Sequence, residues 1–331
     1  RDLWLAFFGA QNDGARVLDV GTGNGAITLL AKEAATAAGR RLEIHGADLA
    51  AIDPPRHVPN GASLFAGIAF HAGVPSERLG FADGSFDAVS GQYALEYTDT
   101  PRALAEVHRV LRPGGRALFV LHHEQSVLIR NARESLAQGA LVLEDTKILR
   151  KLRRHATAER ESAAATRATW AELSAASTHL QQAAATSFAP HLLHVVIDGV
   201  QKLLVVRRET GAAAFEREVD RFEHDVRASV RRLHGLVGCA QSAGQAELIV
   251  ATARRIGFEC GPAGLQHHRG ARRDREDAEM PHLHHVAVGH LFVDHGDERS
   301  RHLHVGKGVR RPSTVLDREV HRADVAEHRL V

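Results

Sequence analysis

The residues best placed to do chemistry form an acid and glycine pattern near the start of the chain. Asp19 lies within a short apolar run formed by Val17, Leu18 and Val20, and three glycines follow at alternate positions, namely Gly21, Gly23 and Gly25. A helical pattern then begins at Ala26. A strand that passes through a glycine turn into a helix presents free backbone N–H groups, and glycine lets a ligand approach more closely than a Cβ would allow. The pattern predicts a small-molecule site, and its spacing also fits the looser fingerprint of dinucleotide-binding proteins.

A second acid lies at the end of the next predicted strand, residues 42–48. This is Asp48, which is 23 residues beyond Gly25. An ionised carboxylate has two acceptor oxygens, which suits the two neighbouring hydroxyls of a diol. The alternative interpretation is that Asp48 caps the N-terminus of a helix.

Further polar side chains follow two later predicted strands. Residues 90–93 follow the fourth strand, and residues 122–124 follow the fifth. In open α/β sheets, ligands bind beyond the carboxyl ends of the strands. Tyr93, His122 and His123 are therefore the candidate catalytic residues, because a neutral imidazole can take a proton from a hydroxyl or amine. The alternatives are a core-filling tyrosine and a hydrogen-bonded pair of loop histidines.

Four stretches in a fixed order, residues 16–25, 42–48, 80–89 and 104–120, resemble the class I S-adenosylmethionine-dependent methyltransferases. The resemblance covers about residues 1–125. It implies a doubly wound, mostly parallel α/β sheet of Rossmann-like type, with S-adenosyl-L-methionine as cofactor. The implied cofactor-binding residues are Asp19, Gly21, Gly23, Gly25, Asp48, Leu49, Glu77 and Gln92. Asp48 would accept the ribose hydroxyls and Glu77 would face the adenine amino group, although Glu77 in a solvated turn is an alternative.

Methyl transfer from a sulfonium is an in-line displacement, so the protein chiefly aligns the reacting atoms. The chain has 42 basic and 40 acidic residues and a net charge of +2, which does not favour nucleic acid or an anionic membrane as partner. We therefore expect a small-molecule acceptor. Two alternatives are a non-catalytic cofactor-binding or scaffold protein and a nicotinamide-dependent oxidoreductase. With two cysteines and no signal peptide, the cytoplasm is the expected location.

The patterns divide the chain into three segments. Alternating strands and helices predict an S-adenosylmethionine-binding α/β domain over residues 1–129, with a parallel sheet. Apolar residues at helical spacing predict a helical cap and the end of the fold over 130–264, and we interpret these apolar stripes as core packing. Residues 265–331 form an atypical tail rich in His and Arg.

This tail holds 11 of the 23 histidines and shows no convincing final strand pair. We expect it to be disordered or foreign to the fold, for example through translation in a shifted reading frame. The competing interpretations are a His-rich metal-binding appendage that includes His282 and His284, and a small β-unit from residues 286–288 and 291–293. The spacing of the histidines matches no familiar zinc motif, so no metal site is predicted.

Overall fold

The computed structural model describes residues 1–260, 264–268 and 283–292, with side chains up to residue 260. The chain forms two compact units. The first contains residues 1–123 and the described residues from 241 onward, and the second contains residues 124–240. The boundaries differ from the expected division at 129 and 264, because the segment that begins at residue 241 returns to the first unit.

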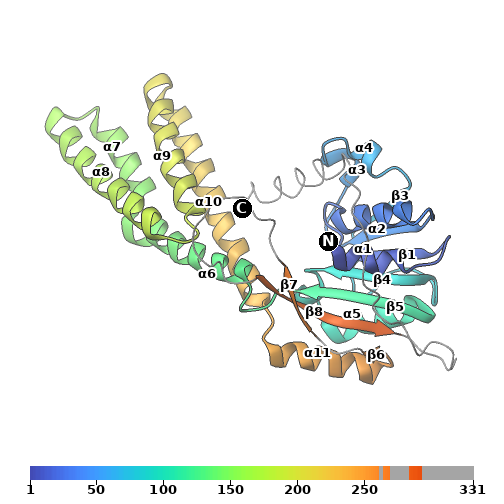
Figure 1. Ribbon diagram of the computed structural model, residues 1–331. Helices are drawn as coiled ribbons and strands as arrows, with labels where there is room; N and C mark the ends of the chain where they lie inside the picture. The colour runs from blue at the N-terminus through green and yellow to red at the C-terminus, as the bar shows by residue number, and fades with distance from the viewer. Residues whose placement is uncertain (261–263, 269–282, 293–331) are drawn as a thin grey trace. The chain divides into compact units, whose positions relative to one another are not determined.

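A single sheet organises the first unit (Figure 1), in the order β3-β2-β1-β4-β5-β8-β6, with β7 paired to β8 off this path. Its strands are β1 (Arg16–Val20), β2 (Glu43–Asp48), β3 (Ile68–Ala72), β4 (Phe86–Gln92), β5 (Leu111–Leu121), β6 (Glu259–Cys260), β7 (Gly264–His268) and β8 (Leu283–Phe292). Within the set β1 to β5, every pair of neighbouring strands is parallel. The predicted doubly wound, mostly parallel sheet is confirmed.

Helices cover both faces of this sheet because its strands alternate apolar side chains between two cores. Val17 packs with α1 (Asp2–Gly9) and α2 (Ala26–Ala37). The next residue, Leu18, packs instead with α5 (Thr100–Val110) and α11 (Ala243–Ile256). In β5, Leu118 packs in the core that contains α1 and α2, and the next residue, Phe119, packs in the core that contains α5 and α11. The remaining short helices of the unit are α3 (Pro54–His57), α4 (Gly61–Leu64) and η1 (Leu95–Tyr97).

The last described strands correct the prediction for the tail. Strand β8 pairs antiparallel with β5 on one side and with β6 and β7 on the other. Cys260 opposes Leu291 and Gly264 opposes Ala287, so β6 and β7 pair with β8 in one continuous register. The expected absence of a final strand pair is therefore wrong for residues 264–268 and 283–292. His282 and the other tail residues, 269–281 and 293–331, lie outside the described residues, so the proposals about them stay predictions.

The second unit is a helical bundle with its own apolar core. Its elements are α6 (Val127–Ala140), the π-helical segment η2 (Leu141–Thr146), α7 (Ile148–Ala158), α8 (Ala163–Thr186), α9 (His191–Glu209) and α10 (Ala212–Cys239). Leu173, Val196 and Phe215 are buried in this core, which confirms that the predicted apolar stripes are packing surfaces. The predicted role of this unit as a cap over the sheet stays a prediction. No helix in the described part of the chain has both the length and the apolar composition required to span a bilayer.

Candidate functional site

The loop between β1 and α2 contains three glycines in the left-handed region of backbone space. Their φ angles are 64° at Gly21, 50° at Gly23 and 83° at Gly25. A Cβ added to Gly21 would lie only 2.4 Å from the Cβ of Ala94, so this position has no room for a side chain. A Cβ added to Gly23 would have no described heavy atom within 4 Å, so the loop backbone is bare to its surroundings there. This arrangement lets a ligand approach the loop backbone closely, because no side chain stands in the way at Gly23.

Asp19 lies in β1 just before this loop and is 3% exposed. It pairs in register with Ser90 of β4, whose hydroxyl donates to Asp19 Oδ1 at 2.7 Å. Burial raises the pKa of Asp19 to about 7, against the opposing effect of the Thr22 and Ser90 hydroxyls, and the nearby Asp48 carboxylate raises it further. A buried acid with this pKa is poised to ionise when a cation approaches.

Asp48 is the last residue of β2, and its carboxylate binds two backbone N–H groups. Its Oδ2 accepts from Gly23 N at 2.8 Å, and its Oδ1 accepts from Ala50 N at 2.8 Å. The alternative role as a helix cap does not apply, because the next helix, α3, has Asp53 as its N-cap. Each carboxylate oxygen keeps a second lone pair for another donor. The neighbouring Leu49 side chain is 71% exposed and offers an apolar surface beside the acid.

Two other predicted cofactor residues hold parts of the protein in place. The side-chain Oε1 of Gln92 accepts from Trp4 Nε1 at 2.7 Å, which ties helix α1 to the end of β4. Glu77 Oε1 accepts from Asp99 N at 2.9 Å and so fixes the N-cap residue of α5. The structure therefore assigns a supporting contact to each side chain, and their predicted contacts with a cofactor stay predictions.

A buried acid and histidine pair lies where β4 and β5 end. Glu96 Oε1 accepts from the His122 backbone N–H at 2.9 Å and lies 2.8 Å from His122 Nδ1. The Glu96 side chain is fully buried, and within the described part of the chain its Oε2 has no hydrogen-bond partner. The Tyr93 ring stacks on the His122 imidazole, with 3.9 Å between ring centroids. Tyr93 itself has a φ of 56°, a strained conformation that is common at functional sites.

The structure thus brings Tyr93 and His122 together, as their positions after neighbouring strands predicted. His123 is also buried, and it forms a backbone bridge with Gln241. Glu96 and Trp4 were not among the predicted site residues. The available signal for Glu96 was that it is the only charged residue between Asp87 and Asp99. Trp4 carried no comparable signal, because it belongs to an apolar run of residues that reads as core.

Comparisons with known proteins agree with this geometry. Residues 18–119 match the family model of a methyltransferase domain. The ubiquinone/menaquinone biosynthesis C-methyltransferase UbiE of Geotalea uraniireducens is 32% identical over 111 residues, which are 33% of this chain and 46% of that protein. The demethylmenaquinone methyltransferase of Thermus thermophilus is 36% identical over 107 residues, 32% of this chain and 46% of that protein. The chain therefore matches slightly under half the length of these curated relatives.

Among solved structures, the YcgJ protein from Bacillus subtilis is 26% identical, with a TM-score of 0.31 over 41% of this chain and 59% of that chain. The sheet order, the glycine loop and the acids at the ends of β1 and β2 define the class of the first unit. It is a Rossmann-like domain of the class I S-adenosylmethionine-dependent methyltransferase type. More particularly, its residues 18–119 are similar to the methyltransferase domain whose family model they match.

Proposed function

We propose that the α/β unit binds S-adenosyl-L-methionine and transfers its methyl group to a small-molecule acceptor. The observation that carries the proposal is the placement of two carboxylates, Asp19 and Asp48, on the adjacent strands β1 and β2 around a glycine loop with bare backbone. The cofactor has a cationic amine that requires an acid and a ribose diol that requires a second acid. Its adenine ring requires an exposed apolar surface. The described residues supply all three.

The residues present fit the cofactor in the following way. Asp19 would hold the ammonium group, since the hydroxyls described beside its buried carboxyl, those of Ser90 and Thr22, are neutral. Asp48 would accept the ribose hydroxyls with the lone pairs that Gly23 and Ala50 leave available. Leu49 would cover the adenine ring. Glu77 and Gln92 remain proposed contacts, with Gln92 oriented by Trp4.

The bound cofactor supplies a methyl group on a positively charged sulfur, so the chain must chiefly position the acceptor and manage its proton. Within this proposal, Glu96 fixes the His122 ring through Nδ1. With Nδ1–H directed to the carboxylate, Nε2 is the basic atom that takes a proton from the acceptor. Tyr93 holds the imidazole plane by stacking on it. Tyr93 and His122 are thus proposed to act at the acceptor side, and His123 is a further candidate there.

A small-molecule acceptor is supported by the names of the relatives, which describe methylation in ubiquinone and menaquinone biosynthesis. The near balance of 42 basic and 40 acidic residues also gives no strong field for a polyanion such as nucleic acid. A cytoplasmic location belongs to the same proposal.

Calorimetry with S-adenosylhomocysteine and with NADH tests cofactor choice directly. We expect binding of S-adenosylhomocysteine and none of NADH. Tight binding of NADH without binding of S-adenosylhomocysteine would replace the proposal with the oxidoreductase alternative. A screen for S-adenosylhomocysteine release across metabolite pools then tests catalysis. Release only with protein or nucleic acid would overturn the small-molecule acceptor, and cofactor binding without release in any pool would favour a non-catalytic binding protein.

A further inference from the structure

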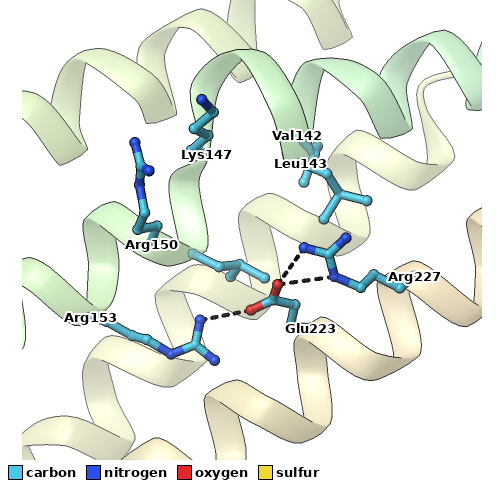
Figure 2. A pocket seen from close by; sticks show the side chains of 8 residues that line it. Val142, Leu143, Lys147, Arg150, Arg153, Glu223 and Arg227 are labelled. Atoms are coloured by element: carbon cyan, nitrogen blue, oxygen red, sulfur yellow. Dashed lines mark hydrogen bonds and ion pairs between the residues drawn. The ribbon is translucent and has the colours of Figure 1, made fainter.

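The helical unit contains a cavity of about 330 Å³ that the proposed methyl transfer does not use. Figure 2 shows its walls, which come from the π-helical segment η2, the residue that follows it, and helices α7 and α10. The lining residues are Val142, Leu143, Lys147, Leu149, Arg150, Arg153, Glu223 and Arg227. The volume falls within the range of small-molecule sites in proteins, about 300–1,000 Å³.

Two of the four cations in this lining are neutralised by acids of α10. Glu223 accepts from Arg153 Nη1 at 2.7 Å, and from Arg227 Nε at 3.0 Å and Nη2 at 2.7 Å. Figure 2 shows Glu223 between the two guanidinium groups. Arg153 also pairs with Glu216 and Asp220. These contacts fix one side of the cavity and leave little charge there for a ligand.

The other two cations, Lys147 and Arg150, have no acidic partner within 4 Å in the described part of the chain. They are three residues apart, and Figure 2 shows both side chains directed away from the Glu223 group. Lys147 has a φ of 49°, at the junction where η2 ends and α7 begins. A π-helical segment and a non-glycine residue in the left-handed region are both unfavourable locally and recur at functional sites.

An apolar surface lies beside these cations. Leu143 is half-buried and supplies this surface, while Val142 and Leu149 are buried in the bundle core. Lysine offers three N–H donors and arginine five, and neither offers an acceptor. The site therefore combines donors of positive charge with aliphatic contacts, and with a single acid that is already paired. This chemistry matches a ligand with one anionic end and one aliphatic end.

We propose that this cavity binds a small organic anion, with a phosphate or carboxylate held by Lys147 and Arg150 and an alkyl portion held against Leu143. Arg153 and Arg227, which are already paired with Glu223, form another wall of the cavity. All the lining residues belong to the helical unit.

Titration calorimetry of the full chain tests the site, with hexyl phosphate, hexanoate and inorganic phosphate as probes. We expect hexyl phosphate or hexanoate to bind, and inorganic phosphate to bind more weakly because it lacks the alkyl portion. The double variant K147Q/R150Q should lose about tenfold or more in affinity, since each substitution removes a charged donor. Both residues are exposed, so the variant should keep the melting temperature of the parent chain.

The matched control is K202Q/R208Q, which removes one lysine and one arginine from exposed positions of α9 that do not line the cavity. It should bind the probes like the parent chain. Equal loss of affinity in both double variants would show non-specific charge attraction and overturn the proposal. So would a failure of both alkyl probes to bind, or equal affinity for hexyl phosphate and inorganic phosphate.

Discussion

The Asp48 carboxylate at the end of β2 holds the glycine loop that follows β1, because its Oδ2 accepts the Gly23 N–H at 2.8 Å. The same side chain fixes the turn after its own strand through Ala50 N. One acid thus joins the two segments that would meet different parts of the cofactor. Its removal affects both the shape of the loop and the acceptor for the ribose.

We predict that Asp48→Ala weakens binding of S-adenosylhomocysteine by roughly 1–3 kcal/mol, the scale of hydrogen bonds to a charged group. Calorimetry measures the change. Asp13→Ala is the matched control, because the exposed Asp13 carboxylate also accepts a backbone N–H, that of Arg41 at 2.7 Å. The control should leave affinity unchanged. If both variants bind S-adenosylhomocysteine like the parent chain, Asp48 is not a ligand of the ribose.

Burial of Asp19 predicts a specific dependence of stability on pH. Folding raises its pKa from 3.8 to about 7, chiefly through burial. Between these values the folded chain holds a proton that the unfolded chain has released. The contribution of the protonated side chain to stability is therefore complete below pH 3.8 and is lost as the pH rises through 7.

Asp19→Asn removes this titration while it keeps the shape of the side chain. The parent chain should lose stability between pH 4.5 and 8, and the variant should not lose it by this route. The free energy of unfolding of the variant minus that of the parent should therefore increase across this range, by at most about 4 kcal/mol. Urea denaturation at several pH values measures the difference, and the exposed Asp13→Asn serves as reference. Stability curves of parent and variant that run parallel across this window would contradict a raised pKa at Asp19.

The parts of the site that local sequence encodes were predictable. Gly21, Gly23 and Asp48 could be placed because a strand, a glycine turn and a strand end each have a local pattern. The partnership of Glu96 with His122 could not, because the two residues are 26 positions apart and meet only when β4 and β5 pair in parallel. Sequence periodicity reports which face of an element is apolar, and it does not report which polar side chains the sheet register brings together.

The same limit explains the missed end of the sheet. Strand β8 pairs with the edge of β5, where Phe119 opposes Val288. These two residues are separated in sequence by more than half the length of the chain. Its sequence is interrupted by histidines and a glycine, so a clean alternation of apolar and polar residues is absent. The β5 edge supplies hydrogen-bond partners that no local pattern shows. The helices of residues 124–240 were predictable because their apolar spacing is local and repeated.

The Glu96–His122 contact predicts a loss of turnover without a loss of cofactor binding. Glu96→Gln keeps an oxygen that can accept from His122 and removes the negative charge that favours a protonated imidazole. Once an acceptor is identified, kcat should fall about tenfold, and by about 100-fold or more in His122→Gln, the scale of general base catalysis. The affinity for S-adenosylhomocysteine should be unchanged in both variants.

The control for a purely structural effect is Glu106→Gln. Glu106 also accepts a backbone N–H, that of Leu79 at 2.9 Å, and pairs with Arg109. It should lower the melting temperature without a comparable fall in kcat. If Glu96→Gln lowers the melting temperature and leaves kcat at the parent value, Glu96 is a structural residue and His122 is not oriented for proton transfer.

The contact between Gly21 and Ala94 predicts that the loop tolerates no side chain at position 21. A Cβ there would lie 2.4 Å from the Ala94 Cβ on a backbone with a φ of 64°. Gly21→Ala should therefore cost about 1–3 kcal/mol in the free energy of unfolding. Gly244→Ala is the control, since a Cβ added at Gly244 in α11 meets no described atom within 4 Å. This substitution should be neutral or slightly stabilising. The double variant G21A/A94G removes the clash and keeps the backbone strain, so it should recover part of the loss. Urea denaturation measures the recovery. If G21A/A94G is no more stable than G21A, the clash with Ala94 is not what excludes a side chain from this loop.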